Sequence, residues 1–150
     1  MMTTAWDEYQ QLVRDEMRKV YSKTVIDYAM NPRNVGNMDA TDGYASITGP
    51  CGDAMDIWLN VKDDTIIKAT FMTDGCSTTI AAGSMITELT KGKSVSQALR
   101  IGQEDVLSAL DGLPEESKHC ALLAANTLKA AVKDYLAFKN EPWKRAYNRH

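Results

Sequence analysis

The sequence predicts an α+β fold, with a small three-stranded antiparallel sheet and helices packed on one of its faces. Between residues 43 and 73 apolar side chains recur at every second position, which is the spacing of half-buried strands. Outside that stretch they recur at threes and fours, the spacing of amphipathic helices. Because most helices follow the strands as a group, we expect them to cover one face of the sheet. A chain of 150 residues is long enough for one domain that buries about two thirds of its unfolded surface.

Residues 5 to 30 are predicted to form helix in two pieces. The second piece, SKTVIDYAM, begins after Ser22, which is a good cap, and Pro32 and Gly36 end it. The sequence leaves open whether the first sixteen residues are a genuine extra helix or an extended start, because the segment MRKVYSKTV opens at Met17. The acidic residues near the N-terminus favour neither a signal peptide nor a transit peptide.

Three strands are expected in the central stretch. The first is GYASITG, residues 43 to 49. The second and third alternate apolar with polar residues and are joined near Asp63 and Asp64, which predicts a hairpin. The apolar positions of this hairpin are Met55, Ile57, Leu59, Val61, Ile67, Ala69 and Phe71.

Helical spacing returns after Gly75 and continues to the segment KGK. Short helices are expected at 94 to 99 and 103 to 110. A long helix with one apolar stripe is expected from about Pro114 to Lys139. The remaining polar residues are expected to form a loosely held tail.

Charge and composition exclude several classes of function. The formal charge is −3, from 17 basic and 20 acidic residues, so nothing indicates a nucleic-acid or anionic-lipid surface. No apolar run approaches the roughly 20 residues of a membrane span. The three cysteines are odd in number and widely spaced, which favours a reducing, cytoplasmic setting over a disulfide framework.

All three cysteines fall at the ends of predicted elements. Cys51 lies in the turn between two strands, Cys76 begins a helix, and Cys120 lies in the first turns of the last helix. Taken alone, each cysteine fits a small, buried and unreactive side chain as well as it fits a functional one. Helix N-termini lower the pKa of a thiol, which we expect for Cys76 and, more weakly, for Cys120.

The neighbours of the cysteines favour a binding site. Gly52 and Gly75 leave room beside two of the sulfurs, and Asp53 and His119 each lie within two residues of a cysteine. Three sulfurs, one carboxylate and one imidazole suit zinc or iron–sulfur chemistry. The alternatives are that Asp53 bonds its own turn and that His119 is a partly exposed helix residue.

The segments around these residues resemble the IscU/NifU-type iron–sulfur cluster assembly scaffolds. The resemblance covers residues 21 to 139, which we treat as a scaffold domain between an N-terminal extension, 1 to 20, and a tail, 140 to 150. The matching segments are YSKTVIDYAMNPRNVG, CGDAM, GCSTTIAAGSMITELTKGKS and HCALLAANTLKAA.

The resemblance implies a non-catalytic scaffold. In the family a pyridoxal-phosphate cysteine desulfurase supplies persulfide sulfur, iron joins, and a [2Fe–2S] cluster is built and passed to apo iron–sulfur proteins. By resemblance Cys51, Cys76 and Cys120 are the ligands of iron and cluster, and Cys120 is the persulfide acceptor. Asp53 is implied as a labilising fourth ligand or gate, and His119 as an alternative ligand. Self-association into a homodimer is left open.

The resemblance has limits. Members served by a dedicated Hsp70-type chaperone carry Leu-Pro-Pro-Val-Lys before the third cysteine, whereas this chain has LPEES, so chaperone hand-off is not expected. The alternative function is a zinc-dependent sulfurtransferase of the SufU type, because zinc accepts three cysteines with an aspartate or histidine. Zinc is also expected to bind the cluster-free form. The presence of His119 and the 44-residue spacing from Cys76 to Cys120 favour the IscU branch. A structural domain with inert thiols is the third alternative.

Overall fold

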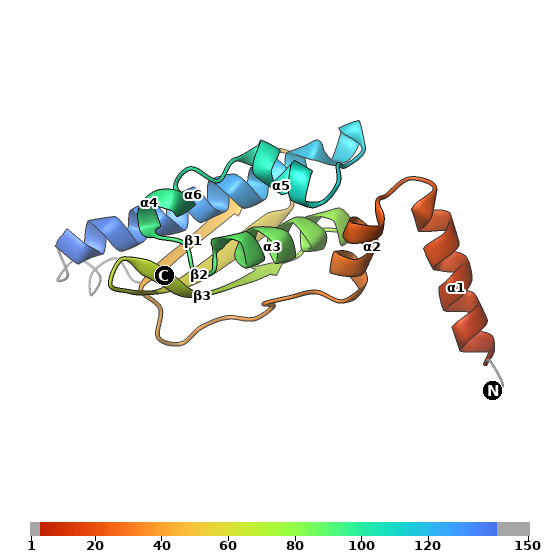
Figure 1. Cartoon of the computed structure of the whole chain (residues 1–150), viewed down its shortest axis with the longest axis horizontal. Coiled ribbons are helices and arrows are strands. Elements are labelled where there is room, and N and C mark those ends of the chain that lie inside the picture. Colours follow the sequence, from red (N-terminus) through yellow and green to blue (C-terminus); the bar gives the residue numbers. More distant parts are fainter. Residues whose placement is uncertain (1–3, 141–150) are drawn as a thin grey trace.

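The computed structural model describes residues 4–140. It confirms the predicted α+β class, with one three-stranded sheet and a long C-terminal helix (Figure 1). The elements are α1 Ala5–Arg18, α2 Lys23–Met30, β1 Gly43–Thr48, β2 Ala54–Lys62, β3 Thr65–Thr73, α3 Ser77–Thr90, α4 Val95–Ala98, α5 Gln103–Ala109, the 3₁₀ turn η1 Glu115–Ser117 and α6 Lys118–Asn140.

The sheet is antiparallel throughout, in the order β1-β2-β3. Its register aligns Ala45 with Ile57 and Ile57 with Phe71, so these side chains share the buried face. The predicted hairpin is confirmed: Asp63 and Asp64 join β2 to β3 with φ angles of 52° and 58°. Two successive positive φ angles match the twist of a tight two-residue hairpin turn.

Helices α3 and α6 cover the buried face of the sheet (Figure 1). Their side chains close over the fully buried Met55, Ile57 and Leu59 of β2. At Gly83 the backbone of α3 approaches the ring of Phe71 so closely that a Cβ there would lie 2.4 Å from a ring carbon. The α3–sheet distance therefore depends on a residue without a side chain.

The segment between α2 and β1 covers the outer edge of β3. Asn34 accepts a hydrogen bond from the backbone N–H of Phe71 at 2.9 Å, and Gly36 donates to the Phe71 carbonyl at 3.0 Å. This pairing occupies backbone groups that an edge strand would otherwise expose. It also ties α2 to the sheet, because the same segment follows directly from that helix.

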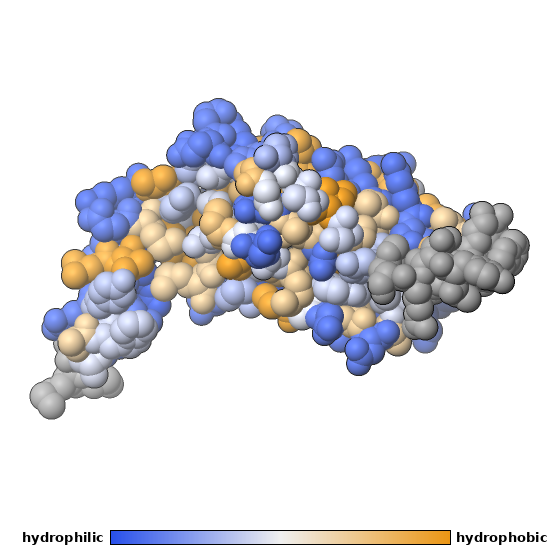
Figure 2. Space-filling model, turned by 180° about the vertical axis from the view of Figure 1, so that it is seen from behind, coloured by the Kyte–Doolittle hydropathy of each residue, from blue (hydrophilic) through white to orange (hydrophobic). Residues whose placement is uncertain are grey.

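The N-terminal extension contains the predicted helix, α1, which starts in a capping box at Thr4. None of its residues is buried, and it projects from the domain (Figure 1). Trp6, Tyr9 and Leu12 are more than half exposed, and Figure 2 shows apolar residues at the surface of this projecting arm. None of the helices among residues 4–140 is long and apolar enough to cross a membrane.

The predicted helix ends differ slightly from the observed ones. The last helix starts at Lys118 rather than at Pro114, because a 3₁₀ turn follows the proline. It also continues through Asn140, which we had expected in the tail. The rest of the predicted tail, 141 to 150, lies outside the described residues.

Candidate functional site

Three element ends meet at one end of the domain: the β1–β2 turn, the start of α3 and the start of α6 (Figure 1). The sheet register brings the β1–β2 turn close to the start of α3, because Met55 in β2 pairs with Thr73 at the end of β3. The backbone N–H of Ala54 also donates to the Asp74 carboxylate at 2.8 Å. The hydroxyl of Thr73 donates to the Ala54 carbonyl at 2.5 Å. Packing of α6 on α3 supplies the third end.

Cys76 is the N-cap residue of α3, and its side chain is exposed. Burial by itself would raise the pKa of this thiol. The Thr78 hydroxyl, 3.1 Å from the sulfur, and the backbone amides of Thr79 and Thr78 outweigh that effect, so the pKa is lowered. The predicted thiolate-favouring position at the helix N-terminus is therefore confirmed for Cys76.

Cys120 is buried, with 2% of its surface exposed. Its sulfur lies 3.4 Å from the hydroxyls of both Thr78 and Thr79. Burial raises the pKa of the Cys120 thiol; the two hydroxyls lower it only in part, and charge on Cys76 and Cys51 raises it further. The expected lowering of this pKa by the helix start was wrong, because desolvation exceeds the effect of the helix terminus.

Asp53 is joined to the same pair of elements. Its carboxylate accepts a hydrogen bond from the Thr79 hydroxyl at 3.0 Å. A Cβ at Gly75 would lie 2.8 Å from that carboxylate and 2.7 Å from the Thr79 hydroxyl, so the contact requires glycine at position 75. At Gly52, by contrast, an added Cβ would meet nothing within 4 Å, and the φ of +91° is what favours glycine there.

The remaining two predicted residues are less closely engaged. The imidazole Nε2 of His119 lies 3.8 Å from the sulfur of Cys120. Cys51 is exposed in the turn that carries Asp53. Negative charge on Cys51 contributes to the raised pKa of the Cys120 thiol. Within residues 4–140 no group of three or more His, Cys, Asp or Glu side chains is arranged to hold a metal ion.

Sequence reasoning missed Thr78 and Thr79, whose buried hydroxyls link Cys76, Cys120 and Asp53. A usable signal was present in the segment CSTT. Once Cys76 is taken as the N-cap, the two threonines are the second and third residues of the helix, whose N–H groups an N-cap side chain faces. Two hydroxyls in that first turn are well placed to contact a thiolate.

Comparison with known proteins gives a consistent result. Residues 20–142 match the family described as NifU-like N terminal domain. The iron-sulfur cluster assembly scaffold protein IscU 1 of Archaeoglobus fulgidus is 45% identical over 117 residues, which cover 77% of this chain and 76% of that protein.

Two crystal structures share the fold. The N-terminal NifU-like protein of Brucella abortus has a TM-score of 0.64 at 17% identity and covers 81% of this chain and 97% of that one. A putative iron-sulfur cluster assembly scaffold protein for the SUF system of Fervidobacterium islandicum AW-1 has a TM-score of 0.61 at 18% identity, with coverage of 77% and 98%. At such identities these two structures bear on the fold alone. The match over residues 20–142 and the 45% identical relative confirm the resemblance seen in the sequence. The chain belongs to the IscU/NifU-type family of NifU-like N-terminal domains.

Proposed function

We propose that this protein is a scaffold on which a [2Fe–2S] cluster is assembled and from which it is passed to apo iron–sulfur proteins. The cluster is cargo, not a resident cofactor, and the protein turns over no substrate of its own. The observation that carries the proposal is the pair of hydroxyls that hold two thiols and one carboxylate together at the meeting of three element ends. Thiolates are the ligands that such clusters require.

The proposed ligand set is the one that the family resemblance implies. Cys76 and Cys120 supply two sulfurs, and Cys51 supplies a third from the exposed β1–β2 turn. Asp53 or His119 completes the set. Because neither Cys51 nor Cys76 is buried, iron can reach the site from solvent.

Sulfur arrives in the proposal as the outer sulfur of a persulfide on a cysteine desulfurase. The Cys120 thiolate attacks that sulfur, a new S–S bond forms on Cys120, the donor's S–S bond breaks, and the donor leaves as a thiolate. Reduction of this sulfur to sulfide takes two electrons, which an external reductant must supply. Cys120 is buried and burial raises the pKa of its thiol, so the proposal has docking of the donor expose and deprotonate this side chain.

Asp53 accounts for release of the cargo. A cluster held by four thiolates is kept permanently, whereas a carboxylate oxygen is a harder and poorer ligand for this iron. The Thr79 hydroxyl offers Asp53 a hydrogen-bonding partner when it leaves iron. The carboxylate thus has two stable positions in the cycle, on iron and on Thr79.

Zinc binding by the cluster-free form remains part of the proposal. The sulfurtransferase alternative differs in its product. A cluster scaffold becomes coloured when it is loaded with iron and sulfide, whereas a zinc enzyme stays colourless because Zn²⁺ is d¹⁰.

The first prediction tests the scaffold function itself. Anaerobic incubation of the full chain with iron and sulfide should give a coloured protein with iron and acid-labile sulfide in equal amounts, and the cluster should transfer to an apo-ferredoxin. Cys120→Ser, which retains size but not the thiolate, should lose most of the colour. A folded wild-type protein that stays colourless and binds no stoichiometric iron would contradict the proposal.

The second prediction concerns the sulfur acceptor. After incubation with a cysteine desulfurase and cysteine, mass mapping should find the added sulfur on Cys120. Without the donor, iodoacetamide should modify exposed Cys51 and Cys76 before buried Cys120. If the added sulfur is found on Cys51 or Cys76 alone, the acceptor has been assigned to the wrong residue.

The third prediction concerns release. Asp53→Ala should keep its cluster longer in air and transfer it more slowly, because the poorest ligand is removed and His119 can take its place. Loss of one hydrogen bond to Thr79 should cost only about 1 kcal/mol of stability. Asp39→Ala, which changes an exposed carboxylate outside the site, is the matched control. Faster cluster loss from Asp53→Ala would mean that Asp53 anchors the cluster instead of labilising it.

A further inference from the structure

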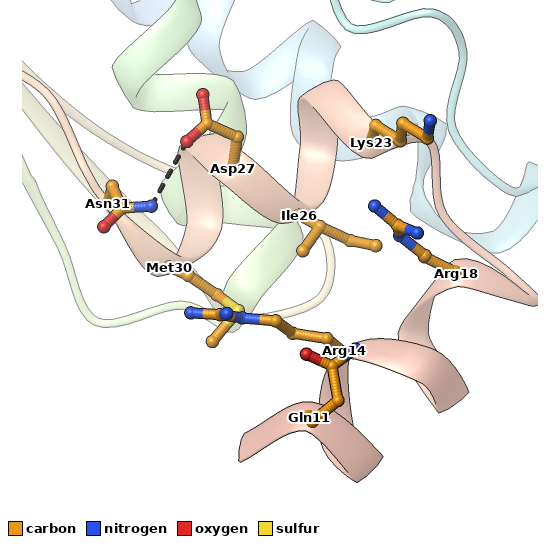
Figure 3. Close-up of a pocket in the computed structure, with 8 residues that line it drawn as sticks. All are labelled: Gln11, Arg14, Arg18, Lys23, Ile26, Asp27, Met30 and Asn31. Carbon is orange, nitrogen blue, oxygen red and sulfur yellow. Dashed lines mark hydrogen bonds between the residues drawn. The ribbon is translucent and has the colours of Figure 1, made fainter. Parts of the chain in front are cut away.

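A hollow of about 340 Å³ lies between α1 and α2, outside the site described above. Figure 3 shows its walls: Arg14 and Arg18 come from α1, and Lys23, Ile26 and Met30 come from α2. Arg18 and Lys23 lie at one end, and Arg14 extends across Met30 at the other. Its volume falls within the range of small-molecule sites, which is about 300–1,000 Å³.

Three cations line this hollow, and none of them forms a salt bridge within the described part of the chain. The one carboxylate in the lining, Asp27, is already bound by Arg33 at 2.8 Å and accepts from Asn31 at 3.2 Å. The hollow is therefore positive, although the whole chain carries a formal charge of −3.

The acidic residues of α1 that follow Gln11 also have hydrogen-bonding or ion-pair partners. Asp15 accepts a hydrogen bond from Gln11 at 2.9 Å, and Glu16 pairs with Lys19 at 2.9 Å. The carboxylates of Glu16 and Asp27 are thus paired with cations outside the hollow, and Asp15 is bound by a neutral amide, while the three cations of the hollow form no ion pair within the described residues. Cations on two facing helices repel each other, so an anion placed between them would remove a repulsion as well as form new contacts.

The donor types indicate which anion fits. Two guanidinium groups and one ammonium suit phosphate oxygens, which arginine binds in a bidentate manner and lysine as a point charge. Lys23 is the first residue of α2, so the positive end of that helix dipole adds to the charge there. Between the two charged ends, the half-buried Met30 and the edge of Ile26, which is 7% exposed, provide a narrow apolar strip that one face of a planar ring can contact.

We propose that this hollow binds a phosphorylated small molecule of the nucleoside di- or triphosphate class. The phosphates bind Arg18 and Lys23 at one end, the ring lies against Met30 and the exposed edge of Ile26, and the Arg14 guanidinium covers the ring at the other end. The ligand would bridge α1, which buries none of its residues in the free chain, to the body of the domain. The proposal does not depend on the cluster-scaffold function.

The test is titration calorimetry of the full, cluster-free chain at low salt with three probes: ADP, pyrophosphate and citrate. ADP and pyrophosphate should bind saturably at one site and weaken as salt is added. ADP should bind several-fold more tightly, because its ring covers the apolar surface. Arg18→Ala should weaken the binding of ADP and of pyrophosphate about tenfold, corresponding to loss of one charge-assisted contact of about 1.4 kcal/mol, whereas Arg14→Ala should weaken ADP binding more than pyrophosphate binding. Both positions are on the surface, and circular dichroism checks that the variants are folded.

Arg100→Ala is the matched control, because Arg100 is an exposed arginine that does not line the hollow. It should leave ADP binding unchanged. Absence of saturable binding, or equal weakening by Arg100→Ala, would overturn the site. Citrate binding as tight as that of pyrophosphate would overturn the assignment to phosphates, and equal affinity for ADP and pyrophosphate would overturn the assignment to nucleotides. All four outcomes are independent of iron and sulfide loading, so they leave the scaffold function untouched.

Discussion

The hydroxyl of Thr79 is the contact on which the site depends. It donates to Asp53 from the β1–β2 turn at 3.0 Å and lies 3.4 Å from the sulfur of Cys120 in α6. Three segments that are far apart in sequence therefore meet at one side chain in the first turn of α3. Thr78 repeats the arrangement between Cys76 and Cys120. Both threonines are buried, and buried hydroxyls need hydrogen-bonding partners inside the protein. The side chains of Cys76, Cys120 and Asp53 serve as these partners.

This arrangement suits a protein that must both bind and release. Hydroxyl contacts with sulfur are weak, and a single hydrogen bond is worth about 1 kcal/mol net, so iron can displace them at little cost. A rigid, fully assembled ligand set would hold a metal whether or not a recipient was present. Here the rigid part is the scaffold: the sheet and α3, held at close distance by Gly83 on Phe71. The proposed ligands Cys76, Cys120 and Asp53 are linked only through exchangeable contacts with the two threonines, and Cys51 is exposed on its turn.

Much of the fold could be predicted because its signals are local. Alternating apolar residues and the Asp63–Asp64 turn predict the hairpin without knowledge of the rest of the chain. The position of Cys76 at a helix start is equally local, and its pKa is lowered because the Thr78 hydroxyl and the backbone amides of that first turn outweigh the effect of burial. The raised pKa of Cys120 could not be predicted in this way, because it depends on burial by residues distant in sequence. The contacts of Thr78 and Thr79 with Cys120 and Asp53 likewise appear only when α6 and the β1–β2 turn are packed against α3, whereas the contact of Thr78 with Cys76 is local.

The most direct measurement is the amount of cluster held per folded chain by two substitutions at one position. Thr79→Ser keeps the hydroxyl, whereas Thr79→Val keeps the shape of the side chain and removes the hydroxyl. After identical anaerobic loading with iron and sulfide, the serine variant should hold close to the wild-type amount. The valine variant should hold well under half, because the Thr79 hydroxyl no longer links the sulfurs of Cys76 and Cys120. If Thr79→Val loads as fully as wild type while folded, the shared hydroxyl does not organise the site, and the account is wrong.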